Sequence, residues 1–205
     1  MLDLNWRKIG AISGILAGLQ FVVLSFVDML IYPGGYNFFE NYFSQLGLAV
    51  INSVDTPVNW FLFATATTLG GIFTVPFYLS IRTVFTETRM QKALSGLGTA
   101  LGVVAAPCLA GIGIFAADLF LFEHAWSTII FFVLTAIAIA TYSIAILLKS
   151  DYQNLYSLVG IIVAIICLLH IYGPGFGTAI MQKAAVYALV SWSAFQGYEL
   201  RKMVQ

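Results

Sequence analysis

Hydrophobic residues gather in six long runs along this chain, and short polar stretches separate the runs. A membrane-spanning helix needs roughly 20 predominantly apolar residues, and each run is close to that length. A helix satisfies its backbone hydrogen bonds within the segment, which lipid cannot do, so apolar runs of this length are expected to be helical. The pattern predicts an all-α membrane protein built as a six-transmembrane-helix bundle. It forms a single domain over residues 1–205, with spans at about 9–31, 60–81, 95–122, 126–148, 155–172 and 178–198.

The longest connection follows the first span, where Pro33 stops the helix. As a helix, residues 37–48 would carry aromatic side chains such as Phe39 and Phe43 on one face and polar side chains on the other. At roughly three turns this helix is too short to cross a bilayer and belongs in the interface. We therefore expect a short interfacial helix over about 37–48 in the first external loop. The pattern leaves open whether this helix lies flat or covers the bundle.

Glycines recur at four-residue intervals in two spans, as Gly10, Gly14 and Gly18 in the first and as Gly98 and Gly102 in the third. Small residues in such stripes allow neighbouring helices to approach closely. We expect both stripes to lie at helix–helix contacts.

Charged residues are scarce and unevenly distributed. They make up 9% of the chain, whereas about a quarter of the residues of a soluble domain are charged. Of the nine Lys and Arg residues, Lys183 alone falls on the side of the membrane opposite to both termini. The positive-inside rule then predicts a multi-pass protein of the cell membrane with both termini in the cytoplasm. No run of basic residues is present, so nucleic acid is not an expected partner.

Ionisable side chains gather near the external ends of the expected spans. Asp28, Asp118 and His170 each lie within about a turn of such an end, and His124 follows in the external turn after the third span. Lys183 enters from the same side, a few residues into the sixth span. Ionisable residues inside a membrane are costly and usually functional. The sequence therefore predicts a polar pocket that opens to the outer leaflet.

The residue types suggest roles within this pocket. Asp118 and His124 are candidates for proton transfer, and Asp28 is a third catalytic candidate that would orient or ligate. The side chains expected to bind the substrate are Asn41, Ser44, Gln45, His170 and Lys183.

Each candidate also has a structural interpretation. Asp118 can be held by hydration near a helix end, and Asp28 can pair with Lys183 as a packing clamp. His124 can cap the turn that contains it, and His170 can bond to a neighbouring carbonyl.

Three chemistries are open to the group. Carboxylates and imidazoles could bind a divalent metal such as zinc and activate a water molecule, although the chain has no HExxH pair. Alternatively, His124 and Asp118 could act as a base and its orienter at a lipid headgroup, with Ser127 or water as the nucleophile. Haem between His124 and His170 is the least favoured, because a loop is a poor place for an axial ligand.

Two motifs resemble those of a known family. The first is NYFSQLG at residues 41–47, and the second is GIFAAD at residues 113–118, which His124 follows. Together with the layout of the whole chain, they resemble prokaryotic six-span membrane proteins catalogued as domain-of-unknown-function family 998.

The chain departs from that family's pattern at two places. Gln45 stands where the pattern has an acidic residue, and Ala116 or Ala117 stands where it has a proline. Since the family has no established activity, the resemblance implies the fold but no reaction. The residues that it highlights are Asn41, Ser44, Asp118 and His124.

Taken together, these features favour an integral membrane protein that binds or processes a lipid or small amphiphile in an outer-leaflet pocket. A hydrolase or transferase acting on headgroups would use the polar group for catalysis, and the sequence leaves open whether the protein is an enzyme. The alternative is a non-catalytic accessory or structural subunit of a membrane protein complex, and a small transporter ranks third. Expected partners are membrane lipids, with a membrane-protein partner or a second copy of the chain also open.

Overall fold

The computed structural model describes residues 2–172 and 178–203, with side chains from Trp6 onwards within these ranges. Most of these residues lie in the helices α1 (Leu2–Leu30), α2 (Pro57–Ile81), α3 (Arg89–Ile114), α4 (Leu121–Leu147), α5 (Asn154–Tyr172) and α6 (Ala179–Lys202). The remaining elements are two short 3-10 helices, η1 (Phe43–Gly47) and η2 (Arg82–Val84), and an antiparallel hairpin of β1 (Val50–Ile51) and β2 (Val54–Asp55).

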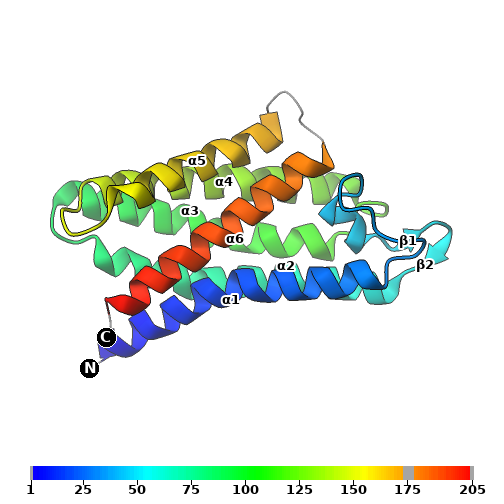
Figure 1. Cartoon of the computed structure of the whole chain (residues 1–205), viewed down its shortest axis with the longest axis horizontal. Coiled ribbons are helices and arrows are strands. Elements are labelled where there is room, and N and C mark those ends of the chain that lie inside the picture. Colours follow the sequence, from blue (N-terminus) through cyan, green and yellow to red (C-terminus); the bar gives the residue numbers. More distant parts are fainter. Residues whose placement is uncertain (1, 173–177, 204–205) are drawn as a thin grey trace.

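The long helices run along a common axis, as Figure 1 shows. The start of α1 and the end of α6 lie together at one end, which we call the terminal end, and the β1–β2 hairpin lies at the other, the hairpin end. Helix α6 crosses the bundle obliquely, from the neighbourhood of α5 to the terminal end of α1 (Figure 1). Helices α1 to α5 are long and apolar enough to cross a membrane, and α6 is of similar length but less apolar.

The third helix is shorter than the sequence predicts. The span expected over 95–122 ends as α3 at Ile114, and α4 already begins at Leu121. Between them the chain turns, with the carbonyl of Ala116 accepting from the amides of Leu119 and Phe120. Hydropathy stays high through this turn because its residues are mostly apolar, so an apolarity pattern alone joins the turn to the helix. Asp118 therefore lies in a loop and not on a span.

The helix predicted over 37–48 is also replaced by other structure. The chain makes a turn and then the 3-10 helix η1, because polar side chains bond to nearby backbone and compete with helical pairing. Phe43 and Leu46 are 3% and 0% exposed, so they point into the bundle and not into lipid. The question that the sequence left open is thereby answered, since this segment covers the hairpin end of the bundle.

The glycine stripes lie at close helix contacts inside the molecule, as predicted. A Cβ atom on Gly14 would lie 2.6 Å from the Phe77 ring of α2, and one on Gly18 would lie 2.6 Å from Val190 of α6. In α3, a Cβ atom on Gly102 would fall 2.3 Å from the Tyr78 ring. These stripes bind the protein's own helices together.

A polar cluster closes the terminal end between the α2–α3 and α4–α5 connections. The Lys149 ammonium, on a residue only 7% exposed, donates to Glu87 and lies 2.9 Å from a carboxylate oxygen of Asp151. Burial alone would lower the pKa of Lys149, but its bonds to the two carboxylates outweigh burial and raise this pKa above its usual 10.5. The same contact holds the pKa of Asp151 below 3.8.

Candidate functional site

The motif side chains at residues 41–47 hold the loop at the hairpin end. The Asn41 side chain accepts from the amide of Asn37 at 2.7 Å and donates to the Gln45 side chain at 3.0 Å. Gln45 also accepts from the amide of Tyr42 at 2.8 Å. The side chains of Asn41 and Gln45 therefore form hydrogen bonds within the loop itself.

Lys183 of α6 joins this loop to the bundle. Its residue is 3% exposed, and its ammonium donates to the carbonyl of Asn41. The ammonium also lies 5.1–5.4 Å from the centroids of the Tyr36, Phe38 and Phe43 rings, within the range of cation–π attraction. Burial raises the pKa of the Tyr36 phenol, so that ring stays neutral beside the cation.

Asp28 is fully buried near the end of α1. One of its carboxylate oxygens accepts from the Asn59 side chain at 2.6 Å, and the other has no hydrogen-bond partner among the described residues. The salt bridges found in this part of the chain do not include one between Asp28 and Lys183. The buried carboxyl is therefore satisfied on one side only.

Asp118 binds the backbone just before and within β1. Its two carboxylate oxygens accept from the amides of Ala49 and Val50, each at 3.0 Å. Asp118 itself is exposed. This arrangement ties the α3–α4 loop to the β hairpin.

The two histidines have different surroundings. His124 donates through Nδ1 to the carbonyl of Phe115 at 3.0 Å, because a carbonyl can only accept. His170 is buried against the Phe132 ring, with ring centroids 4.8 Å apart, and neither of its nitrogens has a partner within the ranges the structure describes.

The sequence-predicted polar residues thus belong to separate places at the hairpin end. Asn41, Gln45 and Lys183 share one network, while Asp28 and Asp118 bind different partners. Across residues 2–172 and 178–203 no three His, Cys, Asp or Glu side chains are placed to hold one metal ion.

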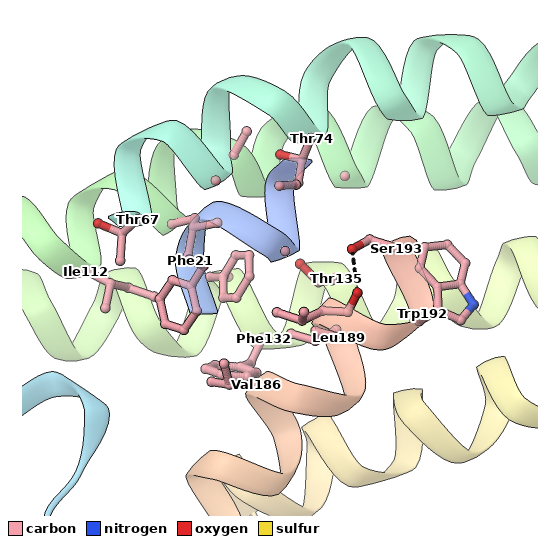
Figure 2. Close-up of a pocket in the computed structure, with 18 of the residues that line it drawn as sticks. Phe21, Thr67, Thr74, Ile112, Phe132, Thr135, Val186, Leu189, Trp192 and Ser193 are labelled. Carbon is pink, nitrogen blue, oxygen red and sulfur yellow. Dashed lines mark hydrogen bonds between the residues drawn. The ribbon is translucent and has the colours of Figure 1, made fainter. Parts of the chain in front are cut away.

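A cavity also lies inside the bundle. Five helices and η1 enclose about 110 Å³ (Figure 2). Ser44 of η1 and Gln182 of α6 line it near the hairpin end, and Ser193 lines it about 16 Å further along α6 at a rise of 1.5 Å per residue. The carbonyl oxygen of the Gln182 side chain accepts from the amide of Phe43 at 2.7 Å, so η1 is fixed at this end. The apolar lining includes Phe21, Phe63, Phe77, Ile112, Phe132 and Leu189.

A family model described as "Protein of unknown function (DUF998)" matches residues 15–196. The chain belongs to this family. Comparison with curated proteins finds no match, and comparison with solved structures finds none either. With its apolar helices, this member of the DUF998 family is an integral membrane protein.

Sequence reasoning did not find the cavity of this DUF998 protein. Its walls come from segments more than 170 residues apart, from Ala17 to Ser193. The available signal was weak: small residues such as Gly70 and Ala106, and threonines such as Thr135, recur inside otherwise apolar helices. Ser44 was expected to bind substrate, and it does line the cavity.

Proposed function

We propose that the protein binds a lipid or small amphiphile, with the apolar body of the ligand inside the bundle cavity. The observation that carries this proposal is an elongated, apolar space roofed by η1. Apolar cavities of comparable size in proteins bind small apolar molecules. One water needs roughly 10–15 Å³, so the 110 Å³ here is larger than a single-water site.

The roof of the cavity suits the entry of an amphiphile. Ser44 and Gln182 supply polar groups where the cavity approaches the hairpin end. The covering segment is held both by the buried side chains of Phe43 and Leu46 and by polar contacts with Lys183 and Asp118. We propose that a ligand enters when this segment opens locally.

We further propose that all six helices cross the membrane, with both termini in the cytoplasm. Helix α6 has 24 residues, about 36 Å, which exceeds the roughly 30 Å of hydrocarbon. Its low apolarity is compatible with crossing because its polar side chains, such as Gln182, Lys183 and Gln196, are buried in protein and not in lipid.

Binding is a better fit than hydrolysis or group transfer. A catalytic pair would place a carboxylate against His124, whose Nδ1 bonds to a backbone carbonyl instead. Asp118 already accepts from two amides. The accessory-subunit alternative gains less support because the glycine stripes pack against the protein's own helices. The transporter alternative gains less support because the polar cluster at Lys149 closes the terminal end of the bundle.

A matched pair of substitutions on α3 tests the proposal. Ala106 lines the cavity, whereas Ala100 is exposed on the same helix. Ala106→Leu is expected to displace a bound lipid, and Ala100→Leu is expected to leave it in place. Protein purified gently from its membrane would be examined by native mass spectrometry and by lipid extraction. An equal amount of lipid in wild type and both variants, or none in wild type, would contradict cavity binding.

A further inference from the structure

One hydroxyl in the cavity wall is unlike its neighbours. Serine and threonine inside helices commonly donate to a carbonyl three or four residues earlier. The cavity-lining residues Thr67, Thr74, Thr128 and Ser193 all do so, at distances of 2.8–3.1 Å. Thr135 of α4 does not, and its Oγ1 has no partner among the described residues.

Thr135 is deeply buried and faces the cavity. The residue is 6% exposed and lines the space, and Figure 2 shows its oxygen turned towards the region that the lining side chains surround. The indole nitrogen of Trp192 is also unpartnered, but in Figure 2 it points away from that region, and a Cβ atom on Gly160 of α5 would lie 3.1 Å from it. A buried hydroxyl without a partner destabilises the protein, because the hydrogen bonds that it made to water are not replaced. A ligand oxygen beside Thr135 would remove that destabilisation.

The depth of Thr135 restricts the chemistry of such a ligand. Thr135 lies about 21 Å along α4 from Leu121, at 1.5 Å per residue, in the half of the cavity away from η1. No acidic or basic side chain is found among the described residues that line the cavity. A charged group at this depth would have no counter-ion and would be strongly disfavoured.

Resting on the proposed function, we propose that the cavity selects an uncharged, largely apolar molecule with a hydroxyl or carbonyl oxygen, which bonds to Thr135. A short-chain aliphatic alcohol fits this description and the size of the cavity. Its hydroxyl oxygen accepts from Thr135. Ser193 lines the same cavity, and its oxygen retains a free lone pair while the hydroxyl donates to the Val190 carbonyl.

Two probes of equal length and two matched variants test this inference. The probes are 1-hexanol and 1-hexene, which suit a cavity of about 110 Å³, and binding of each to purified protein is measured by equilibrium partition with radiolabel. Thr135→Val removes the unpartnered hydroxyl at nearly constant shape. Thr141→Val serves as the control, because Thr141 lies on the same helix outside the cavity lining and its hydroxyl donates to the Ala138 carbonyl at 2.8 Å.

Wild type and Thr141→Val are expected to prefer the alcohol over the hydrocarbon. Thr135→Val is expected to bind the alcohol roughly three- to tenfold more weakly, which corresponds to the loss of one net hydrogen bond, and to bind 1-hexene as wild type does. If both probes bind equally and Thr135→Val changes neither, Thr135 does not select the ligand, while the proposed lipid cavity stands. If neither probe binds wild type, both proposals are overturned. A melting temperature for each variant verifies that it is folded, and Thr135→Val should be no less stable than wild type.

Discussion

Replacing Asp118 by Asn perturbs one loop contact with little change in shape. The aspartate accepts from the amides of Ala49 and Val50, each at 3.0 Å. Asparagine keeps one acceptor oxygen but turns an NH₂ donor towards the other amide, so one bond is lost. Hydrogen bonds to charged groups contribute roughly 1.5–3 kcal/mol, and exposure of Asp118 to solvent reduces this value. We expect the free energy that holds the hairpin closed to fall by about 1–2 kcal/mol.

Hydrogen exchange measured by mass spectrometry can detect this change locally. A loss of 1–2 kcal/mol corresponds to roughly 5- to 30-fold more frequent opening, so amide exchange in residues 49–55 should accelerate by that factor. Helices away from the loop should exchange as in wild type. Glu123→Gln is the control, since Glu123 is a nearby exposed carboxylate that makes no hydrogen bond or salt bridge within the described chain. Unchanged exchange in Asp118→Asn, or the same acceleration in both variants, would refute the clamp and return Asp118 to its catalytic interpretation.

Two further predictions concern stability. Gly71→Ala places a Cβ atom 2.6 Å from the Ala106 carbonyl oxygen and should lower the free energy of unfolding by about 1–3 kcal/mol through overpacking. In Gly96→Ala the nearest atom to the new Cβ is 3.8 Å away, so this variant should gain about 0.5–1 kcal/mol of helix stability. Thermal melting in detergent compares the two variants, and equal melting temperatures would contradict the close contact at Gly71. The Lys149–Asp151 contact should stabilise the terminal end above pH 3.8, where Asp151 is ionised even when unfolded, and lose that effect as pH falls through its lowered pKa. The raised pKa of Lys149 predicts a second pH dependence at the alkaline end. The contact stabilises the fold fully below pH 10.5, and this stabilisation is lost as the pH rises through the raised pKa. Unfolding measured across pH should lose its acidic limb in Asp151→Asn, and an unchanged profile would count against the contact.

Apolar run length predicted the helices well, because backbone hydrogen bonding in lipid leaves few alternatives. The fifth helix was placed at 155–172 and is found at Asn154–Tyr172. The same signal failed at Asp118, because hydropathy does not record a turn built from apolar residues. It also failed at 37–48, where Asn41 and Gln45 bond to nearby backbone and where Phe43 is buried in the protein interior.

The candidate site was predictable only in part, for a related reason. The sequence placed Asn41 and Lys183 on one side of the membrane, and the structure joins them directly. It could not reveal that Asp28 pairs with Asn59, because the register between two helices depends on packing along their whole length. The cavity depends on five helices at once, so no single segment carries its pattern.

The contact between Lys183 and Asn41 also imposes an order on biosynthesis. The two residues are 142 positions apart, so at about 5–20 residues per second the loop is synthesised roughly 7–28 s before its anchor exists. During that interval the rings that later surround the ammonium have no cation to hold. If α6 crosses as proposed, Lys183 must pass through the bilayer at a cost of roughly 2.5–3.5 kcal/mol near its centre, and it reaches a prepared aromatic acceptor on the far side. Helix α6 therefore supplies the contact that fixes the loop following α1 over the cavity.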